Sequence, residues 1–384
     1  MEWGSRVLLV NIGPKKTGVG NYASLLLNYA KLQYDVLNIS LFGRGYPDDF
    51  PRSKNGKTFF FGQKTDNFFK NYIIQYFLLN KREFFKFLDS IGERYDCILL
   101  DQQDLAMMAN IFHSRFNCDI YITVHDMGHF KYAPFHPFKF FLIKNFKALK
   151  SENIKAIICD SINTAHELAE KYPDISNKIR VVELSVDQNR YAIRDKKEAR
   201  KRLNLPLDKI LALSVGKDGY VKNVRNFINS IRYIKNDNVT FVRVGKLISS
   251  KKDFELLPNS QKERIVVAED VSDDVLPLYY NAADIFVFPS LKEGFGLELL
   301  EAHLSGNIVI TTDRPPMNDL VIPGASMLIK NPDDPEEIAG LIDTACEKYD
   351  IMQKELMNAL SAYKNRFSVE RFVKETEDIL RGDH

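Results

Sequence analysis

The 384-residue chain has few cysteines, no long hydrophobic run and no excess of either charge. Its 4 cysteines are scattered singly, so we expect neither a disulfide framework nor a structural zinc site. No window of about 18 residues is apolar and uncharged, and the N-terminal apolar stretch is too short for a signal peptide. The 53 basic and 51 acidic residues give no global attraction to nucleic acid, although a local basic patch stays possible. We therefore expect a reduced, cytoplasmic protein without a membrane span.

Hydrophobic residues make up 45% of the chain, which is enough to build large cores and excludes a disordered protein. The 19 glycines and 15 prolines exclude collagen-like and low-complexity sequence. Because single cores stop growing at about 250–300 residues, a chain of this length predicts two domains.

Short apolar runs alternate with longer amphipathic stretches, which predicts parallel sheets covered by helices on both faces. The predicted strands lie at 6–10, 35–40, 97–100, 119–124, 156–159, 180–183, 210–215, 239–244, 264–267, 285–288, 308–311 and 326–329. The predicted helices include 22–32, 162–171, 224–234, 275–282, 297–304, 335–348 and 369–380. Two such series indicate an α/β protein with two Rossmann-like, doubly wound domains. The polar stretch 187–208 is the expected boundary, giving domains 1–187 and 188–365.

The most informative stretch is 286–306, where a predicted strand, a turn with Gly294 and Gly296, and a helix follow one another. Such a turn lets the backbone approach a phosphate, and the helix N-terminus adds unpaired N–H groups and partial positive charge. Glu293 and Glu301 flank the turn at a helical span of roughly 12 Å. One carboxylate could meet a sugar and the other a ribose, with a diphosphate between them. Alternatively, Glu301 is an ordinary solvated helix acid.

Two lysines, Lys217 and Lys222, follow the predicted strand 210–215. Lysine is a compact cation that binds phosphate, so this pair could neutralise a diphosphate leaving group. The alternative is that both are surface lysines on a loop.

Gly18, Gly20 and Ala23 match the pattern G-x-G-x-x-A of dinucleotide-binding proteins. That site needs its glycines directly after the first strand and an acid at the end of the second. Residues 11–17 intervene here and the acid is missing, so an NAD site is disfavoured. We expect instead a flexible loop near an inter-domain cleft.

His125 and Asp126 follow the predicted strand 119–124, where a histidine can hydrogen-bond a substrate oxygen. The alternative is a metal cluster of His125, Asp126 and His129. Because no helical pattern runs through this stretch and no further ligand is obvious, we expect no metal.

Two segments, 68–88 and 130–150, combine many aromatic residues with basic ones and almost no acids. Such segments suit an anionic membrane surface, but they equally suit ordinary helices with aromatic residues in the core. An RNA-binding role has the same ingredients, yet no RNA-module motif is present.

Together these features resemble the retaining GT-B glycosyltransferases of glycosyltransferase family 4, also called glycosyl transferase group 1. Glu293 to Glu301 resembles the E-x7-E signature of that family, and 270–290 is similar to its usual lead-in. Lys217 and Lys222 resemble its phosphate-binding basic pair, and His125 the histidine that follows a strand of the first domain. Residues 365–369 resemble the turn into a C-terminal helix, 366–384, that packs back on the first domain.

The resemblance implies an active site in the cleft between the two domains. The catalytic residues would be Glu293 and His125 at the donor sugar and Lys222 at the diphosphate. Glu301 would bind the ribose hydroxyls, and backbone amides near residues 295–297 would help hold the phosphates. The implied donor-binding residues are Lys217, Lys222, Glu301, Gly294, Phe295, Gly296, Leu297, Gly18, Gly20 and Val271.

The implied reaction moves a sugar from a UDP- or GDP-sugar to a glycan or lipid-linked acceptor, with retention and without metal or cofactor. The implied location is the cytoplasm, with possible peripheral attachment to the inner membrane face. The sequence departs from the family pattern at Lys217, where arginine is usual, at Glu298, where proline is frequent, and at Asp319, where glutamate is usual. The rival functions are a GT-B nucleotide-sugar 2-epimerase, a non-catalytic nucleotide-sugar-binding protein and an NAD-linked oxidoreductase.

Overall fold

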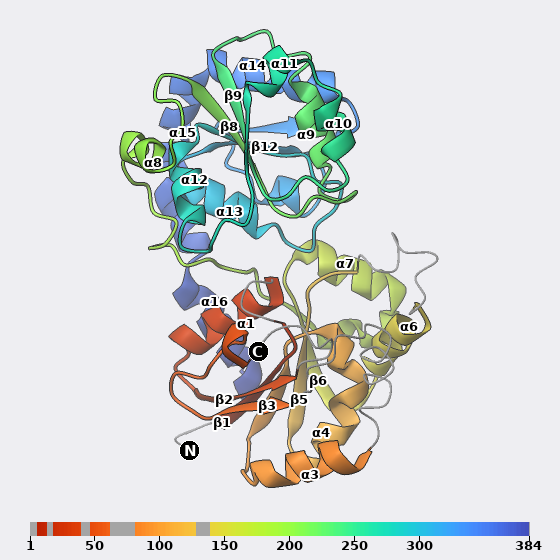
Figure 1. Ribbon diagram of the computed structural model, residues 1–384. Coiled ribbons are helices and arrows are strands. Elements are labelled where there is room, and N and C mark those ends of the chain that lie inside the picture. Colours follow the sequence, from red (N-terminus) through yellow and green to blue (C-terminus); the bar gives the residue numbers. More distant parts are fainter. Residues whose placement is uncertain (1–5, 14–17, 40–46, 62–80, 128–138, 384) are drawn as a thin grey trace. The chain divides into compact units, whose positions relative to one another are not determined.

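The computed structural model describes residues 6–13, 18–39, 47–61, 81–127 and 139–383 (Figure 1). The chain forms two compact units. The first consists of Met1–Leu184 together with Val369–His384, and the second of Ser185–Ser368. Each unit is an α/β layer structure built on its own parallel sheet.

The sheet of the first unit has the strand order β3-β2-β1-β4-β5-β6-β7, and every pair of neighbours is parallel. Its strands are β1 (Arg6–Asn11), β2 (Gln33–Ile39), β3 (Thr58–Phe61), β4 (Cys97–Leu100), β5 (Asp119–Val124), β6 (Ile154–Cys159) and β7 (Ile179–Val181). Its described α-helices are α1 (Gly18–Tyr29), α3 (Lys81–Ile91), α4 (Ala109–Phe116), α6 (Lys139–Ala148), α7 (Ile162–Lys171) and α16 (Val369–Arg381).

The C-terminal helix α16 packs against α1 in the first unit. The buried Glu377 side chain accepts hydrogen bonds from the backbone N–H groups of Lys31 and Leu32, at 2.8 and 2.9 Å. These groups follow the end of α1, so α16 satisfies donors that the chain leaves unpaired there.

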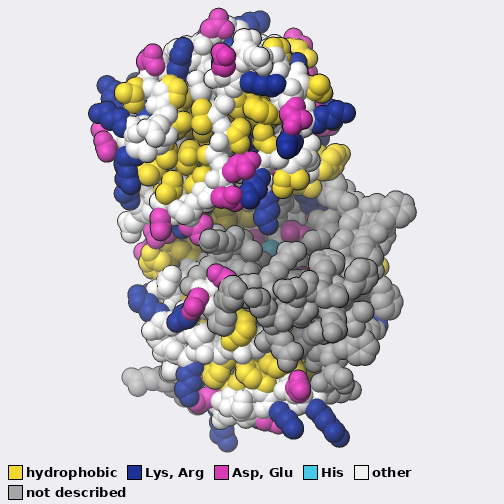
Figure 2. All heavy atoms as spheres, viewed as in Figure 1, with side chains coloured by type: hydrophobic (Ala, Val, Ile, Leu, Met, Phe, Trp, Pro, Cys, Tyr) yellow, Lys and Arg dark blue, Asp and Glu magenta, His cyan; other side chains and the backbone are white. Residues whose placement is uncertain are grey.

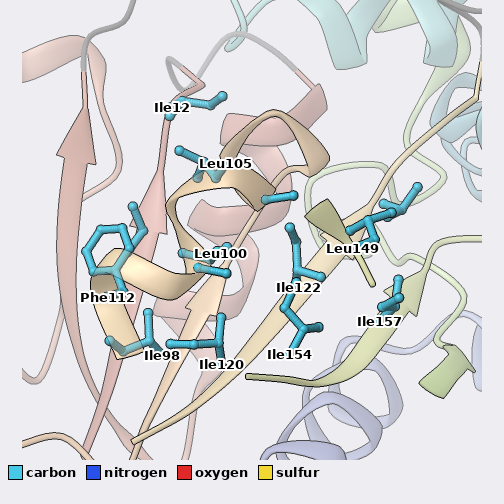
Figure 3. Close-up of a cluster of buried hydrophobic side chains, with 14 of the residues drawn as sticks. Ile12, Ile98, Leu100, Leu105, Phe112, Ile120, Ile122, Leu149, Ile154 and Ile157 are labelled. Carbon is cyan, nitrogen blue, oxygen red and sulfur yellow. The ribbon is translucent and has the colours of Figure 1, made fainter. Parts of the chain in front are cut away.

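The central strands of the first unit are apolar on both faces, as a sheet covered by helices requires. Figure 3 shows Ile98 and Leu100 of β4 beside Ile120 and Ile122 of β5, with Phe112 of α4 to their left. All five side chains are buried, so this layer anchors the strand ends that carry the polar residues described below.

The sheet of the second unit has the order β10-β9-β8-β11-β12-β13 and is parallel throughout. Its strands are β8 (Ile210–Val215), β9 (Val239–Val244), β10 (Ile265–Ala268), β11 (Ile285–Phe288), β12 (Ile308–Thr312) and β13 (Ser326–Ile329). Its helices are α8 (Lys196–Arg202), α9 (Val224–Ser230), α10 (Lys251–Glu255), α11 (Asn259–Lys262), α12 (Leu276–Ala282), α13 (Leu297–Leu304), α14 (Pro335–Glu347) and α15 (Tyr349–Arg366).

Both sheets have a point at which the strand order reverses, between β1 and β4 in one and between β8 and β11 in the other. In open α/β sheets, ligands bind outside the carboxyl ends of the strands at such a switch point. The fold therefore marks two places where chemistry is expected.

The polar stretch 187–208 is not simply a linker, because it contains helix α8. The Asp195 side chain caps this helix by accepting from the N–H of Glu198. On its buried side, Arg200 forms a 2.5 Å ion pair with Asp284, which also pairs with Lys196. A buried ion pair is not visible in a polarity pattern, and this explains why the sequence analysis missed the helix.

Charges of both signs are spread over the face of the second unit that Figure 2 shows, between hydrophobic side chains. This agrees with the near balance of acids and bases in the sequence. None of the helices formed by the described residues has both the length and the apolar character that crossing a lipid bilayer requires.

Candidate active site

The switch point of the second unit brings together the loop after β8 and the loop after β11. Gly216 follows β8 with a φ of +124°, a conformation that side chains disfavour. A Cβ atom at this glycine would lie 3.7 Å from Glu298 Oε1 and 3.9 Å from Lys222 Cε. The start of α13 and the Lys222 side chain therefore converge on the end of β8.

Lys222 is the centre of an ion cluster at this point. Its Nζ atom lies 2.7 Å from Glu298 Oε1 and 2.9 Å from Glu293 Oε1. It also lies 4.7 Å from the centre of the Phe288 ring, a cation–π geometry. Ser290 donates its hydroxyl hydrogen to Glu293. Lys222 is thus not an ordinary surface lysine, so that alternative is wrong for Lys222.

Burial and charge act in opposite directions on this cluster. Burial lowers the pKa of Lys222, but the carboxylates of Glu298 and Glu293 outweigh it, and the net shift is upward. Burial raises the pKa of Glu298, but the Lys222 ammonium outweighs it, and the net shift is downward. The pKa of Glu293 is raised, chiefly by burial. Lys222 stays a cation and Glu298 a carboxylate over the physiological pH range.

Helix α13 begins at Leu297, after Gly294, Phe295 and Gly296. Gly296 is the N-cap residue and has a φ of +114°, so this turn requires glycine. Phe295 is buried and meets the ring of Phe367 edge-on. The turn directs the N-terminus of α13 toward the loop that carries Lys222, as an anion-binding site requires.

Glu301 is buried one turn further along α13, with 8% of its surface exposed. Its Oε2 atom accepts a hydrogen bond of 2.7 Å from the Tyr280 hydroxyl, and Tyr191 also bonds to it. Burial raises the pKa of Glu301 to about 7, against these hydrogen bonds, which lower it. The alternative of a solvated helix acid is therefore wrong.

Lys217 and Val271, two further predicted donor-binding residues, lie on loops of the same unit. Lys217 directly follows Gly216 at the end of β8, is exposed, and forms no ion pair with any residue that the structure describes. Val271 is half-exposed and follows β10. The structure gives neither a contact to the ion cluster, so their roles stay predictions.

Sequence reasoning missed two charged residues at this edge. Glu298 was noted only as a departure from a family pattern, yet it makes the shorter of the two ion pairs to Lys222. Arg243, on β9, is fully buried and donates from Nη2 to the Gly216 carbonyl oxygen. Its Nε and Nη1 groups have no hydrogen-bond partner among the residues that the structure describes, and burial lowers its pKa to about 10. The signal for Arg243 was a charged residue inside an otherwise apolar strand.

The switch point of the first unit is built around His125. Its Nδ1 lies 2.6 Å from Asp160 Oδ2, and its Nε2 lies 2.6 Å from the backbone oxygen of Asp101. Burial lowers the pKa of His125, but the Asp160 carboxylate outweighs it and raises the pKa to about 9. Both ring nitrogens thus donate within the protein. A bond from His125 to a sugar requires that one of these contacts be exchanged.

Asp101 lies directly after β4 and is fully buried, and its carboxyl group lies close to the backbone N–H of Ile12. Burial raises its pKa well above the usual range. Nearby, Asn11 donates to Asn38 at 2.6 Å. This edge therefore holds uncharged or acidic groups around one imidazole.

The remaining predictions for the first unit have mixed outcomes. Gly18 and Gly20 lie in the first turn of α1, so the prediction of a flexible loop there is wrong. Within the described part of the chain, no group of three His, Cys, Asp or Glu side chains could hold a metal ion, while His129 lies outside that part. Metal independence stays a prediction.

The aromatic and basic segments are described only in part, because residues 68–80 and 130–138 lie outside the described residues. In the described part, Phe84 and Leu88 of α3 and Phe146 near the end of α6 are buried in the core. These aromatic side chains behave as the ordinary-helix interpretation expects. Attachment to a membrane stays a prediction.

The fold and the two switch points are those of the GT-B class, and solved structures agree with this over nearly the whole chain. The crystal structure of Anabaena Alr3699/HepE in complex with UDP and glucose has a TM-score of 0.78 at 17% identity, covering 98% of this chain and 100% of that one. The crystal structure of WaaG, a glycosyltransferase involved in lipopolysaccharide biosynthesis, has a TM-score of 0.70 at 14% identity, covering 98% and 100%. At these identities the likeness concerns the fold.

Residues 195–366, which lie in the second unit, match the family model described as Glycosyl transferases group 1. The O-antigen chain mannosyltransferase RfbU of Salmonella typhimurium is 27% identical over 217 residues, 56% of this chain and 57% of that protein. The capsular polysaccharide biosynthesis glycosyltransferase CapM of Staphylococcus aureus is 25% identical over 250 residues, 63% and 65%. The chain thus spans little more than half the length of the first of these relatives, and just under two thirds of the second.

Proposed function

We propose that the protein transfers a sugar from a nucleoside-diphosphate sugar to a glycan or lipid-linked acceptor, with retention of anomeric configuration and without a metal ion. The observation that carries this proposal is the ion cluster of Lys222 at the N-terminus of α13, with Glu301 buried in the same helix. The cation and the helix N-terminus suit a diphosphate, and the carboxylate suits the hydroxyl groups of a ribose.

Each group of the cluster has a part in this scheme. Lys222 and the backbone N–H groups at the start of α13 bind the diphosphate. Glu301 accepts hydrogen bonds from two ribose hydroxyls in place of the tyrosine contacts or beside them. Glu293, held by Ser290, faces the donor sugar and stabilises positive charge that develops at its anomeric carbon.

The reaction needs no nucleophilic side chain under front-face attack. The bond between the anomeric carbon and the leaving phosphate oxygen breaks while the acceptor oxygen bonds to the same face of that carbon. The leaving phosphate takes the proton of the acceptor hydroxyl. Because the electron pair of the breaking bond stays on the leaving oxygen, negative charge develops on the diphosphate, where a preorganised ammonium group and helix N-terminus act most strongly.

The named relatives support the substrate class. RfbU is named for mannosyl transfer in O-antigen chains and CapM for capsular polysaccharide synthesis, while HepE was solved with UDP and with UDP-glucose. These names favour a nucleotide-sugar donor and a glycan acceptor.

The test begins with a thermal-shift panel of UDP, GDP, ADP and NAD. We expect one nucleoside diphosphate to raise Tm, since a ligand at about 100 times its Kd stabilises the folded state by about 2.7 kcal/mol. Radiolabelled UDP- and GDP-sugars then report donor hydrolysis and transfer. No shift with any diphosphate contradicts the proposal, and a shift with NAD alone favours an oxidoreductase.

The same assay separates the two other rivals. A 2-epimerase converts UDP-N-acetylglucosamine to its 2-epimer without an acceptor. A non-catalytic binding protein shows a higher Tm with the nucleotide but releases no sugar. Retention is read from the anomeric configuration of the product by NMR. Activity that survives EDTA supports metal independence.

The proposed membrane contact rests on the basic and aromatic segment 130–150. Replacing its lysines by glutamate should abolish co-sedimentation with anionic liposomes if the protein docks on such a surface. Unchanged co-sedimentation would reject the membrane-bound form of the proposal and leave a water-soluble glycan as the acceptor.

A further inference from the structure

The ammonium group of Lys222 already has two anionic partners, although the proposed reaction needs it for a diphosphate. Glu298 Oε1 lies 2.7 Å away and Glu293 Oε1 2.9 Å away. The two carboxylates repel each other through space, and Glu298 also raises the pKa of Glu301. Lys222 is thus surrounded by more negative than positive charge.

Glu298 occupies the two positive features that an incoming diphosphate would use. It is the second residue of α13, where the unpaired N–H groups of the helix favour an anion. A hydrogen bond from its own backbone N–H stabilises its carboxylate, and the same carboxylate is bound to Lys222. Proline, frequent at this position in the resembled family, is uncharged.

We propose that Glu298 is an internal substitute for the donor diphosphate, and that it sets the affinity of the enzyme for nucleoside diphosphates. Donor binding exchanges the Lys222–Glu298 pair for a Lys222–phosphate contact, and product release restores the pair. Glu298 thereby weakens nucleotide binding and speeds release of the nucleoside diphosphate. This inference rests on the proposed function, because it assigns Lys222 to the diphosphate.

The contacts of Glu298 favour a binding role over a structural one. Its side chain is 22% exposed, and its contacts in the structure are with Lys222 and its own backbone N–H. A glutamine has the same shape and leaves Lys222 paired with Glu293. The substitution Glu298→Gln should therefore remove the competing charge and keep the fold.

The experiment measures Kd by calorimetry for whichever of UDP, GDP and ADP gives the largest thermal shift. We expect Glu298→Gln to bind that nucleotide about tenfold more tightly than the unmodified protein, the effect of removing about 1.4 kcal/mol of competition. The gain in affinity caused by Glu298→Gln should be smaller for the corresponding nucleoside monophosphate, which carries less negative charge. A role of Glu298 in folding alone would not distinguish the two nucleotides.

Glu336→Gln is the matched control. Glu336 is the second residue of α14, so it has the same place in its helix as Glu298, but it is exposed and forms no ion pair with a described residue. This variant loses the same charge and should keep the Kd of the unmodified protein. Glu298→Ala serves as a second test if Glu298→Gln lowers Tm.

Two results would overturn the inference in distinguishable ways. If the unmodified protein binds the nucleotide and both Glu298 variants bind it equally or more weakly, Glu298 does not compete, while the proposed function stands. If UDP, GDP and ADP bind none of the proteins, the proposed function fails and the inference fails with it.

Discussion

The two units share a strand order around their switch points but carry opposite chemistry there. In the second unit a lysine sits between carboxylates at a helix N-terminus. In the first unit an imidazole is fixed between a carboxylate and a backbone carbonyl, and the fully buried carboxyl group of Asp101 lies beside it. The topology decides where polar groups gather, and the residues at the strand ends decide which ligand those groups can bind.

The difference also concerns how readily the contacts can be exchanged. Lys222 has a flexible stem and acidic partners that a phosphate can replace, so its contacts suit a site that binds and releases an anion. His125 is a rigid ring with both nitrogens engaged, so its contacts suit a fixed local structure. The following substitutions test this contrast.

Lys222→Ala should have the largest effect, because it removes the positive charge of the second unit's cluster and leaves Glu293 and Glu298 facing each other. We expect transfer or donor hydrolysis to fall by roughly 10²–10³, the scale of losing one preorganised charge contact. The control is Lys251→Ala, which removes an exposed lysine whose partner Glu255 lies 4.0 Å away. Equal turnover by Lys222→Ala and its control would contradict the assignment of Lys222 to the diphosphate.

His125 should make the stability of the protein depend on pH. Its pKa is about 9 in the folded protein, and about 6.5 is usual for an unfolded chain. Its ion pair therefore contributes in full below about pH 6.5, and the contribution is lost as pH rises through about 9. Complete loss of this contribution would amount to about 3 kcal/mol of the free energy of unfolding.

Urea unfolding at several values between pH 6.5 and 9.5 measures this loss. His125→Asn cannot titrate and should have a flatter profile over that interval. His166→Asn, which changes an exposed histidine on α7, should keep the profile of the unmodified protein. A profile for His125→Asn as steep as that of the unmodified protein would show that this imidazole is not charged in the folded state.

Glu301 should make nucleotide binding depend on pH in the second unit. Its carboxyl group has a pKa of about 7 because it is buried, and only the ionised form accepts hydrogen bonds from two ribose hydroxyls. We therefore expect the affinity for the bound nucleoside diphosphate to be about tenfold higher at pH 8 than at pH 6. Glu301→Gln should bind more weakly at pH 8 and lose most of that difference. Because the phosphates of the ligand titrate alike with both proteins, the difference between the two profiles isolates Glu301.

The sequence alone predicted the α/β class and the two sheets because short apolar runs alternate with longer amphipathic stretches along the chain. The family resemblance also implied that Lys222 and Glu293 share one site, and their charged atoms lie 2.9 Å apart. The sequence could not predict the ion pairs of α8 with Asp284 or of Glu298 with Lys222, because no local pattern marked α8 as a helix or Glu298 as a residue of the site. Nor could it predict that both nitrogens of His125 would be used within the protein.

Tyr280→Phe should have the smallest effect and sharpen the comparison most. The hydroxyl of Tyr280 donates to Glu301 at 2.7 Å and so lowers the pKa that burial has raised. Without this hydrogen bond the carboxylate is less stabilised. The pH at which nucleotide affinity is half-way between its low-pH and high-pH values should therefore rise by about half a unit. Tyr279→Phe is the matched control, since Tyr279 is the neighbouring residue of α12 and its hydroxyl has no hydrogen bond to a described residue. A midpoint that moves in both variants, or in neither, would mean that the tyrosine does not tune Glu301. A shift in Tyr280→Phe alone would show that, unlike the fixed imidazole of the first unit, the carboxyl group of Glu301 is adjusted by a single neutral hydrogen bond.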